Sequence, residues 1–402
     1  MLRTLYRSPA LRSAASFGIG GVAFAVANLI FARAISARDY GLLSLMIGVV
    51  AVAGPMAPLG VDYVVVRRGW ALNHGLRRQG LLTSALVGLL TVAVAAWLYR
   101  PGLYLLAAIL VATVATSVSQ LVSAHYQSQR QFGISMLFIQ ATNWSLLAIA
   151  VVAWMFGIAS AAPSAALIAA SGVIIALAGW FLVARRQAAE PEAVTMSGHW
   201  QEAVSLMLIN VTGSALLQLE RLVLPMTVGI EQLALFGVAA ALVGSPFRML
   251  QMAATFTIVP RMRDAATVAE RRRLLRHEFA LFCVIMAPAS VALWLLAPAI
   301  AHWFLHGKYD LGGPLILAMI LSGLLKVLSA FATSVVSALA PEKGLRLLGA
   351  VSWGCILLAV CIAFGLRPWG LVGVIYAVSC GWIARIIVAI WISAPHLRSA
   401  QP

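Results

Sequence analysis

The residues best placed to do chemistry are charged side chains inside long apolar segments. Arg248 and Lys326 fall near the middle of the apolar segments 232–258 and 311–338. A charge at the centre of a bilayer costs about 2.5–3.5 kcal/mol on insertion scales, so such residues usually line a water-filled cavity or pair with one another. Two cations of this kind attract anionic groups. We therefore predict a cationic wall in the C-terminal half of the chain.

Polar residues at helical spacing accompany these cations. At about 100° per residue, Asn210, Gln218 and Arg221 share one face of the segment 203–229. Gln251 shares a face with Arg248 in the same way. Such stripes can be hydrogen-bonded seams between packed helices, but a cation at the centre of a stripe favours a wet cavity. We predict that these residues bind substrate.

Three further residues complete the predicted substrate-binding set. Gln140 and Asn143 lie on the polar face of the segment 133–156, where they could bind sugar hydroxyls or, alternatively, join packed helices. Arg385 lies near one end of the segment 369–393, from which its side chain could instead reach the membrane surface. The whole predicted set is Arg248, Lys326, Arg221, Arg385, Asn210, Gln218, Gln251, Gln140 and Asn143.

Two acidic residues are candidates for coupling to an ion. Glu220 is the only carboxylate deep in an apolar segment, where it could exchange a proton or Na⁺ as its surroundings change. The alternative is a structural ion pair with Arg221 or another buried cation. Asp62, at the end of the segment 41–61, is the second candidate. Together with Arg67 and its neighbour, Asp62 could instead anchor the helix at the membrane interface.

The elements that carry these residues follow from composition. The chain has 402 residues, of which 62% are hydrophobic and 10% charged, whereas soluble domains carry about 25% charged residues. Its apolar runs reach the roughly 20 residues that a helix needs to cross a bilayer. Because sheets and loops cannot face lipid with unpaired backbone groups, the fold class is an all-α integral membrane protein. We expect about twelve spans: 13–32, 41–61, 80–99, 103–123, 133–156, 163–184, 203–229, 232–258, 279–300, 311–338, 345–366 and 369–393.

The formal net charge of +16 comes from basic residues in the connections between spans, and it does not indicate a surface that binds nucleic acid. Most lysines and arginines lie in every second connection between the spans, on the same side of the membrane as the N-terminus. Basic loops stay in the cytoplasm, so both termini are predicted to be cytoplasmic, in a multi-pass protein of the cell inner membrane. We expect no nucleic acid as a partner. The residues expected on the opposite side are Arg33, Arg38, Arg100, Lys308 and Arg367.

An internal repeat suggests two halves. The polar stretch 185–202 is the best boundary, which gives an N-terminal six-helix lobe at 1–190 and a C-terminal six-helix lobe at 191–402. An aromatic-glycine pair opens the second span of each half, at Tyr40-Gly41 and at Phe236-Gly237, and each is followed by a proline. Two halves of the same orientation, related by a pseudo-two-fold, would place a substrate site between them.

Several kinds of chemistry are missing from the sequence. It has no GxxxxGK[ST] motif for ATP and no HExxH, paired-cysteine or GxSxG pattern. The four cysteines lack metal-ligand spacing. We therefore expect no enzyme activity, no catalytic residues, no metal site and no cofactor.

Two segments resemble a known family. Gly18–Arg68, which contains ARDYG, is similar to the first two spans of polysaccharide transporters. Leu219–Leu242 resembles the start of their second half. These proteins are the lipid-linked oligosaccharide (O-antigen) flippases of the multidrug/oligosaccharidyl-lipid/polysaccharide exporter superfamily. The likeness extends over nearly the whole chain through its twelve spans, although its motifs are diffuse.

The resemblance implies an alternating-access flippase, and the buried carboxylate Glu220 suggests coupling to H⁺ or Na⁺. Its cargo would be a polyprenyl-diphosphate-linked oligosaccharide, moved from the cytoplasmic to the periplasmic leaflet for O-antigen or exopolysaccharide synthesis. Membrane lipid, a glycan polymerase and glycosyltransferases would be its partners. Two rivals belong to the same superfamily, a cation-coupled multidrug exporter and a peptidoglycan-precursor flippase. A rival of another class is a non-transporting scaffold for a glycan-synthesis complex.

Overall fold

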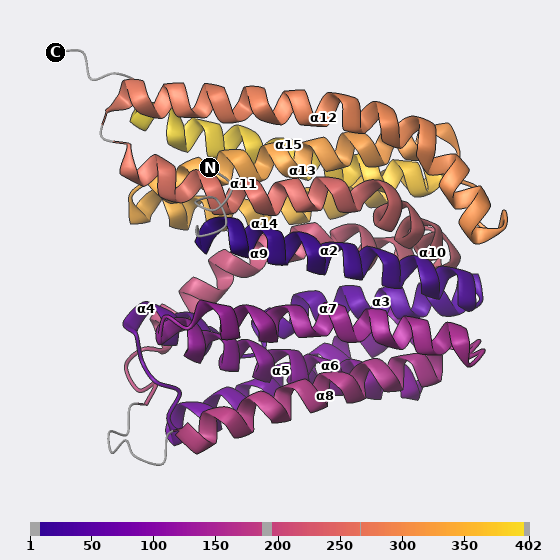
Figure 1. The fold of residues 1–402 in the computed structure, drawn as a ribbon, viewed down its shortest axis with the longest axis horizontal. Helices are drawn as coiled ribbons and strands as arrows, with labels where there is room; N and C mark the ends of the chain where they lie inside the picture. Colours follow the sequence, from indigo (N-terminus) through magenta and orange to yellow (C-terminus); the bar gives the residue numbers. More distant parts are fainter. Residues whose placement is uncertain (1–8, 187–194, 266, 398–402) are drawn as a thin grey trace. The chain divides into compact units, whose positions relative to one another are not determined.

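The structure, a computed structural model, describes residues 9–186, 195–265 and 267–397 (Figure 1). Within these ranges the chain is helical and contains no strand, which confirms the all-α fold. Eleven of the described helices are long and apolar enough to cross a membrane, and a shorter apolar helix covers Gly18–Ala34. The number of spans therefore agrees with the prediction, and the chain is a multi-pass membrane protein.

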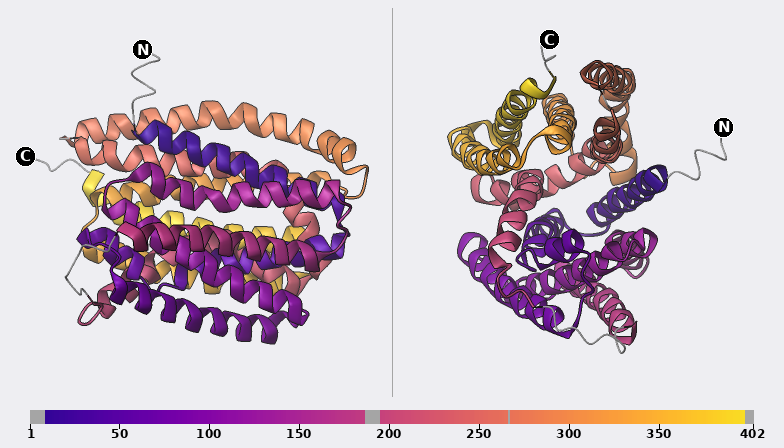
Figure 2. Two further views of the ribbon diagram at one scale, coloured as in Figure 1. Left: turned by 60° about the horizontal axis from the view of Figure 1, so that its bottom comes forward. Right: turned by 90° about the vertical axis from the view of Figure 1, so that its left-hand side faces the viewer.

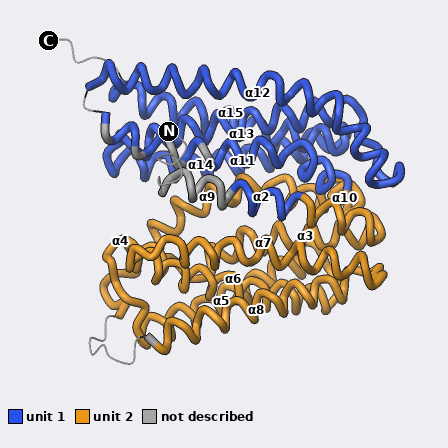
Figure 3. The backbone as a smooth tube through the Cα atoms, in the orientation of Figure 1, with its two compact units in different colours: residues 1–25, 235–402 blue, residues 26–234 orange. Residues whose placement is uncertain are grey.

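The chain divides into two compact units (Figure 3). Unit 1 contains residues 1–25 and 235–402, and unit 2 contains residues 26–234. The helix Trp200–Thr227 contacts the helix Ala37–Met56. It therefore belongs to the same unit as the helices that precede it in the chain. The two six-helix lobes divided at residue 190 stay a prediction.

Unit 2 is built around one central helix, α6. This helix contacts five others, and it carries five of the polar residues that line the pocket described below. Figure 2 shows the long helices of this unit, coloured indigo to magenta, running side by side. Small residues such as Ala108, Ala112 and Ala115 are buried along it and allow the neighbouring helices to approach closely. The helices of this unit are α3 (Ala37–Met56), α4 (Val61–Arg68), α5 (His74–Tyr99), α6 (Leu103–Ser128), α7 (Phe132–Met155), α8 (Ala161–Arg186) and α9 (Trp200–Thr227), with the second part of α2 (Pro9–Ala34) and the start of α10 (Ile230–Ala239).

The ARDYG motif forms the start of α3. Ser36 is the N-cap, and its hydroxyl accepts a hydrogen bond of 3.1 Å from the Asp39 backbone N–H. The Asp39 carboxylate in turn accepts a hydrogen bond of 3.1 Å from the backbone N–H of Ala161, the first residue of α8. One acidic side chain therefore joins the starts of two helices that lie 122 positions apart in the chain.

The next two residues of the motif are fixed by packing. Tyr40 is fully buried, and its hydroxyl donates a hydrogen bond of 3.1 Å to the Asn28 side-chain oxygen on α2. At Gly41 an added Cβ would lie 2.2 Å from the Ile230 carbonyl oxygen, so only glycine fits. The aromatic-glycine pair thus stabilises a helix contact.

Unit 1 is built around α13, which contacts α11, α12, α14 and α15. Gly323 of α13 allows this close packing, because an added Cβ would lie 2.5 Å from the Phe247 ring. The predicted proline turn at Pro246 follows a π-helical turn, Ala240–Gly244, which widens the helix just before the proline. The helices are α11 (Ser245–Asp264), α12 (Val268–Leu305), α13 (Gly313–Leu339), α14 (Glu342–Gly365) and α15 (Gly370–Leu397), with the 3₁₀ turn Arg367–Trp369.

Candidate functional site

A break between α3 and α4 positions a pocket of unit 2 that contains a buried carboxyl. Gly60 has φ +84°, a conformation that favours glycine. An added Cβ at Gly60 would lie 2.0 Å from the Ala203 carbonyl oxygen of α9. On the other side, Gly54 lies so close to α6 that its Cβ would approach the Thr116 methyl group to 2.6 Å. The chain therefore turns sharply between α6 and α9 before α4 begins.

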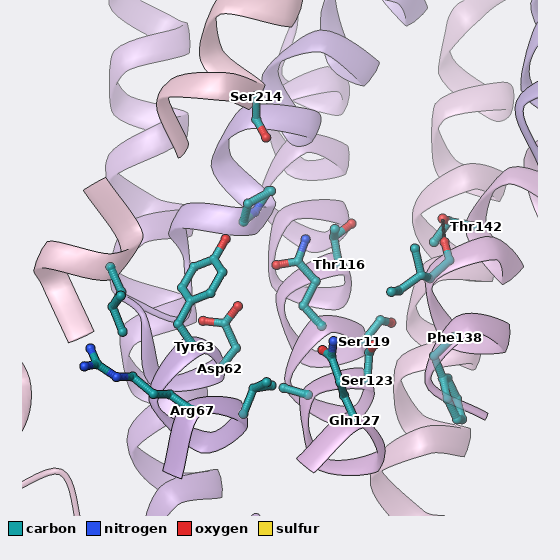
Figure 4. Close-up of a pocket in the computed structure, with 16 residues that line it drawn as sticks. Asp62, Tyr63, Arg67, Thr116, Ser119, Ser123, Gln127, Phe138, Thr142 and Ser214 are labelled. Carbon is teal, nitrogen blue, oxygen red and sulfur yellow. Dashed lines mark hydrogen bonds between the residues drawn. The ribbon is translucent and has the colours of Figure 1, made fainter. Parts of the chain in front are cut away.

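The pocket that results has a volume of about 550 Å³ and is formed by residues of α3, α4, α6, α7 and α9 (Figure 4). This volume is within the range of about 300–1,000 Å³ typical of small-ligand sites. Hydroxyl and amide side chains alternate with aromatic and aliphatic ones around it. The lining residues are Pro55, Asp62, Tyr63, Val66, Arg67, Thr116, Ser119, Gln120, Ser123, Ala124, Gln127, Phe138, Ile139, Thr142, Leu206 and Ser214.

Asp62 is the acidic group of this pocket. Its residue is 7% exposed, and its Oδ1 atom is buried without a hydrogen-bond partner. Burial raises the pKa of the Asp62 carboxyl from 3.8 to about 7, although backbone N–H groups of Asp62 and Tyr63 offset part of this effect. Asp62 can thus gain or lose a proton near neutral pH.

The neighbouring arginines bind a different carboxylate. Arg68 Nη2 lies 2.7 Å from Glu202 Oε2, and Arg67 Nη1 lies 3.4 Å from Glu202 Oε1. No arginine or lysine lies within ion-pair distance of Asp62 in the part of the chain that the structure describes. Arg67 lines the same pocket as Asp62, while both arginines bind Glu202 of α9. Ion coupling and anchoring at the interface both stay predictions for Asp62.

The other polar groups of the pocket suit a hydroxyl-rich ligand. Ser119 Oγ is buried without a hydrogen-bond partner. Thr142 donates a hydrogen bond of 3.1 Å to the Ile139 carbonyl, and Ser123 Oγ lies 2.7 Å from Ser135 Oγ. Figure 4 shows Ser119, Ser123 and Gln127 on one side of the pocket, opposite Asp62. Such groups can donate to or accept from hydroxyls of a bound molecule.

The predicted stripe on α9 is divided by its surroundings. Asn210 is exposed and donates a hydrogen bond of 2.8 Å to the Leu206 carbonyl of its own helix. Gln218, Glu220 and Arg221 are buried, and Arg221 Nη1 donates to Gln218 Oε1 at 3.4 Å. The Arg221 stem packs so closely on α3 that a Cβ at Gly48 would lie 2.9 Å from it. Arg221 is thus part of a helix contact.

The stripe nevertheless reaches the pocket through one residue. Ser214, one turn from both Asn210 and Gln218, lines the pocket beside α6 and α3. Gln140 and Asn143 lie elsewhere in unit 2, and the Asn143 side-chain amide donates to Gln140 Oε1 at 2.9 Å. Their mutual hydrogen bond is typical of the packing alternative, since each satisfies the other.

The cations of unit 1 differ in exposure. Arg248 is exposed and lies over the Phe24 ring, with its guanidinium carbon 5.4 Å from the ring centroid. Lys326 is half-buried on α13, one turn from Gly323, where α11 and α13 touch. Gln251 is half-buried on α11, one turn after Arg248. These residues therefore lie near one helix contact of unit 1.

Arg385 occupies a more enclosed place in unit 1. Its guanidinium carbon lies 5.8 Å from the Trp382 ring centroid, and its Nε atom is buried without a hydrogen-bond partner.

In the described part of the chain no group of three or more His, Cys, Asp or Glu could hold a metal ion.

Several pocket residues were not singled out from the sequence. Tyr63, Ser119, Ser123, Gln127 and Thr142 have no charge and no spacing that separates them from ordinary packing residues. The useful signal was present at Gly60, because a glycine two residues before an aspartate in an otherwise apolar segment suggests a break that turns polar groups inward.

Comparison of the fold with solved structures identifies similar transporters. The chain is similar to a multidrug resistance MATE family transporter of the MOP superfamily in an inward-facing conformation, with a TM-score of 0.66, 13% identity and 94% of each chain covered. It is similar to the lipid II flippase MurJ in an inward closed conformation, with a TM-score of 0.71, 11% identity, and 95% of this chain and 87% of that chain covered.

A third similar structure is a MOP superfamily transporter from Pyrococcus furiosus, described as having a binding pocket of reverse polarity. The TM-score is 0.59 at 15% identity, with 98% of this chain and 97% of that chain covered. No family model and no curated protein matches the sequence. At these identities the comparison establishes the fold alone, which is similar to the folds of these transporters.

Proposed function

We propose that this protein is a membrane transporter that flips a polyprenyl-diphosphate-linked oligosaccharide from the cytoplasmic to the periplasmic leaflet. The observation that carries the proposal is the pocket of unit 2, in which hydroxyl and amide groups surround a buried carboxyl. The fold supports it, because similar folds occur in a lipid II flippase and in multidrug transporters.

The pocket can recognise sugar. Gln127, Thr142 and Ser119 offer donors and acceptors for sugar hydroxyls, while the Tyr63 and Phe138 rings supply apolar surface for a pyranose face. Its volume of about 550 Å³ suits part of an oligosaccharide rather than the whole lipid-linked cargo. The lipid tail would remain in the bilayer.

Positive charge supports the diphosphate part of the proposal. Arg248 is exposed and Lys326 is half-buried, so both side chains can contact an anionic group without moving out of a packed helix interior. The buried Arg221, by contrast, would serve chiefly to hold α9 against α3.

Ion coupling would use the buried acids. Asp62 is the better candidate, since it faces a pocket and its pKa is raised to about 7. Glu220 is buried on α9 and could respond to a change in helix packing. Either H⁺ or Na⁺ could drive export through such a carboxyl.

The setting that we propose follows from the basic loops. Both termini would be cytoplasmic in the cell inner membrane, and a glycan polymerase and glycosyltransferases would act before and after transport. Genes for such enzymes beside this one would support the glycan cargo.

A second candidate function is cation-coupled multidrug export. The observation that favours it is Asp62, because a buried carboxyl without an ion-pair partner could bind a cationic amphiphile. The substitution Asp62→Asn distinguishes the two functions. If the protein exports cationic drugs, the variant should lose binding of a cationic dye. If it transports a glycan, the variant should bind an uncharged glycan largely as before.

Binding to the purified full-length protein tests the proposal. A fluorescent polyprenyl-diphosphate sugar should bind, and Gln127→Leu together with Thr142→Val should weaken its binding at least about tenfold, since two hydrogen bonds to sugar are lost. The matched control is Gln129→Leu, which changes an exposed glutamine at the end of the same helix but outside the pocket. Equal binding by pocket and control variants would contradict the proposed glycan site.

A further inference from the structure

A second pocket lies at one end of unit 1, between the last turn of α11 and the first turns of α12. Its volume is about 480 Å³. Two arginines and a histidine provide most of its polar lining, and one acid joins them. The lining residues are Arg261, Ala265, Glu270, Arg273, Leu274 and His277.

The two acids near the pocket are already engaged. Glu270 forms the capping box of α12, in which its carboxylate accepts a hydrogen bond of 3.2 Å from the Thr267 backbone N–H. Glu278 forms an ion pair with Arg261. Neither carboxylate is therefore left to bind Arg273 or His277.

Neighbouring arginines donate hydrogen bonds to carbonyl groups at the ends of α11 and α15. Arg271 donates a hydrogen bond of 3.2 Å to the Ala265 carbonyl, and Arg272 donates one of 2.6 Å to the Leu397 carbonyl. Arg273 and His277 differ from them, because neither makes a hydrogen bond or ion pair within the part of the chain that the structure describes. The pocket thus presents two exposed donors that an anionic group can contact.

An apolar stripe continues from these two donors along α12. At about 100° per residue, Arg273, His277, Leu281 and Val284 lie within an arc of about 80°. Leu281 is 47% and Val284 is 70% exposed. The helix is 38 residues long, more than a bilayer core requires, so its basic first turns can extend into the headgroup region.

We propose that this pocket binds the phosphate of an anionic phospholipid whose acyl chains lie along α12. Arg273 and His277 would hold the phosphate, and Leu281 and Val284 would contact the chains. A soluble phosphate would meet the same cations but would gain nothing from the apolar stripe. The site is separate from the proposed glycan pocket, which belongs to unit 2.

Native mass spectrometry of the detergent-solubilised full-length protein tests this proposal. Phosphatidylglycerol should remain bound at lower concentration than phosphatidylcholine with the same acyl chains. Arg273→Gln should weaken phosphatidylglycerol binding about fivefold, as expected for one charge at a lipid surface, and Arg273→Lys should retain most of the binding.

The matched control is Arg276→Gln, which removes an exposed charge from the same helix but outside the pocket. It should leave phosphatidylglycerol binding within about twofold of the unchanged protein. Equal weakening by Arg276→Gln and Arg273→Gln would overturn the proposal, because it would show that general surface charge attracts the lipid. Displacement of the lipid by glycerol 1-phosphate at comparable concentration would also overturn it in favour of a soluble phosphate.

Discussion

Arg68 Nη2 lies 2.7 Å from Glu202 Oε2 and thereby ties α4 to the first turn of α9. At the other end of α4, Asp62 lines the pocket without an ion pair, whereas Arg67, which also lines the pocket, binds Glu202. A short helix of eight residues thus separates one buried acid from two exposed cations.

Replacing Asp62 tests its raised pKa. Because the carboxyl binds its proton more tightly in the folded protein, stability should fall as pH rises from about 4 to about 7. Asp62→Asn should remove this part of the pH dependence and raise the melting temperature at pH 8 by at least about 2 °C. Thermal unfolding in detergent at pH 4 and pH 8 measures the effect, and identical pH profiles for the two proteins would argue against a buried carboxyl.

The Arg68–Glu202 pair should contribute little to stability. Arg68 is 40% exposed and Glu202 21% exposed, so solvent screens their attraction. A double-mutant cycle with Arg68→Ala and Glu202→Ala should give a coupling free energy below about 1 kcal/mol. The more exposed pair Arg346–Glu342 is the control and should give still less. A coupling of several kcal/mol for Arg68–Glu202 would show that the pair is effectively desolvated.

Gly60 should be among the least replaceable residues of unit 2. Gly60→Ala combines an unfavourable positive φ with a contact of 2.0 Å to a backbone oxygen, so the turn must shift. Gly69→Ala is the matched control, since φ is +67° there but no atom lies within 4 Å of the added Cβ. We expect a cost of about 1–2 kcal/mol at Gly69 and clearly more at Gly60. Comparable melting temperatures for both variants would contradict the close approach of the turn to α9.

Charge reversal in unit 1 tests the role of its cations in transport. Arg248→Glu and Lys326→Glu should each lower export of an anionic lipid-linked glycan at least about tenfold, because each replaces attraction with repulsion. Arg346→Glu changes an arginine that is exposed at the start of α14 and should leave export unchanged. Accumulation of the lipid-linked precursor in cells measures export, and normal export by both reversed variants would remove these cations from the mechanism.

Much of the fold could be predicted from the sequence because lipid leaves few alternatives. Apolar runs of about 20 residues must be helices, and glycines and prolines mark their breaks. The expected proline-containing turn at Pro246 begins α11, directly after the π-helical stretch Ala240–Gly244. The role of ARDYG could not be predicted, since the hydrogen bond from Ala161 to Asp39 joins residues 122 positions apart.

The candidate site was harder to predict than the fold. Charge drew attention to Arg221, whose burial against Gly48 is a matter of packing. The pocket depends instead on Gly60 and Gly54, which bring α4 and α6 together, and on uncharged groups such as Gln127 and Thr142. Polar residues of this kind are common in packed helices, and only the three-dimensional arrangement distinguishes a seam from a pocket.

Translocation in vesicles is the most direct measurement of whether this protein flips a lipid-linked glycan. Protein reconstituted with a fluorescent polyprenyl-diphosphate sugar in the inner leaflet should expose the sugar to a membrane-impermeant quencher, and Gln127→Leu together with Thr142→Val should slow this exposure at least about tenfold. Gln129→Leu should behave like the unchanged protein. If the sugar stays protected at the rate of protein-free vesicles while the same preparation exports a cationic dye, the account of a glycan flippase is contradicted.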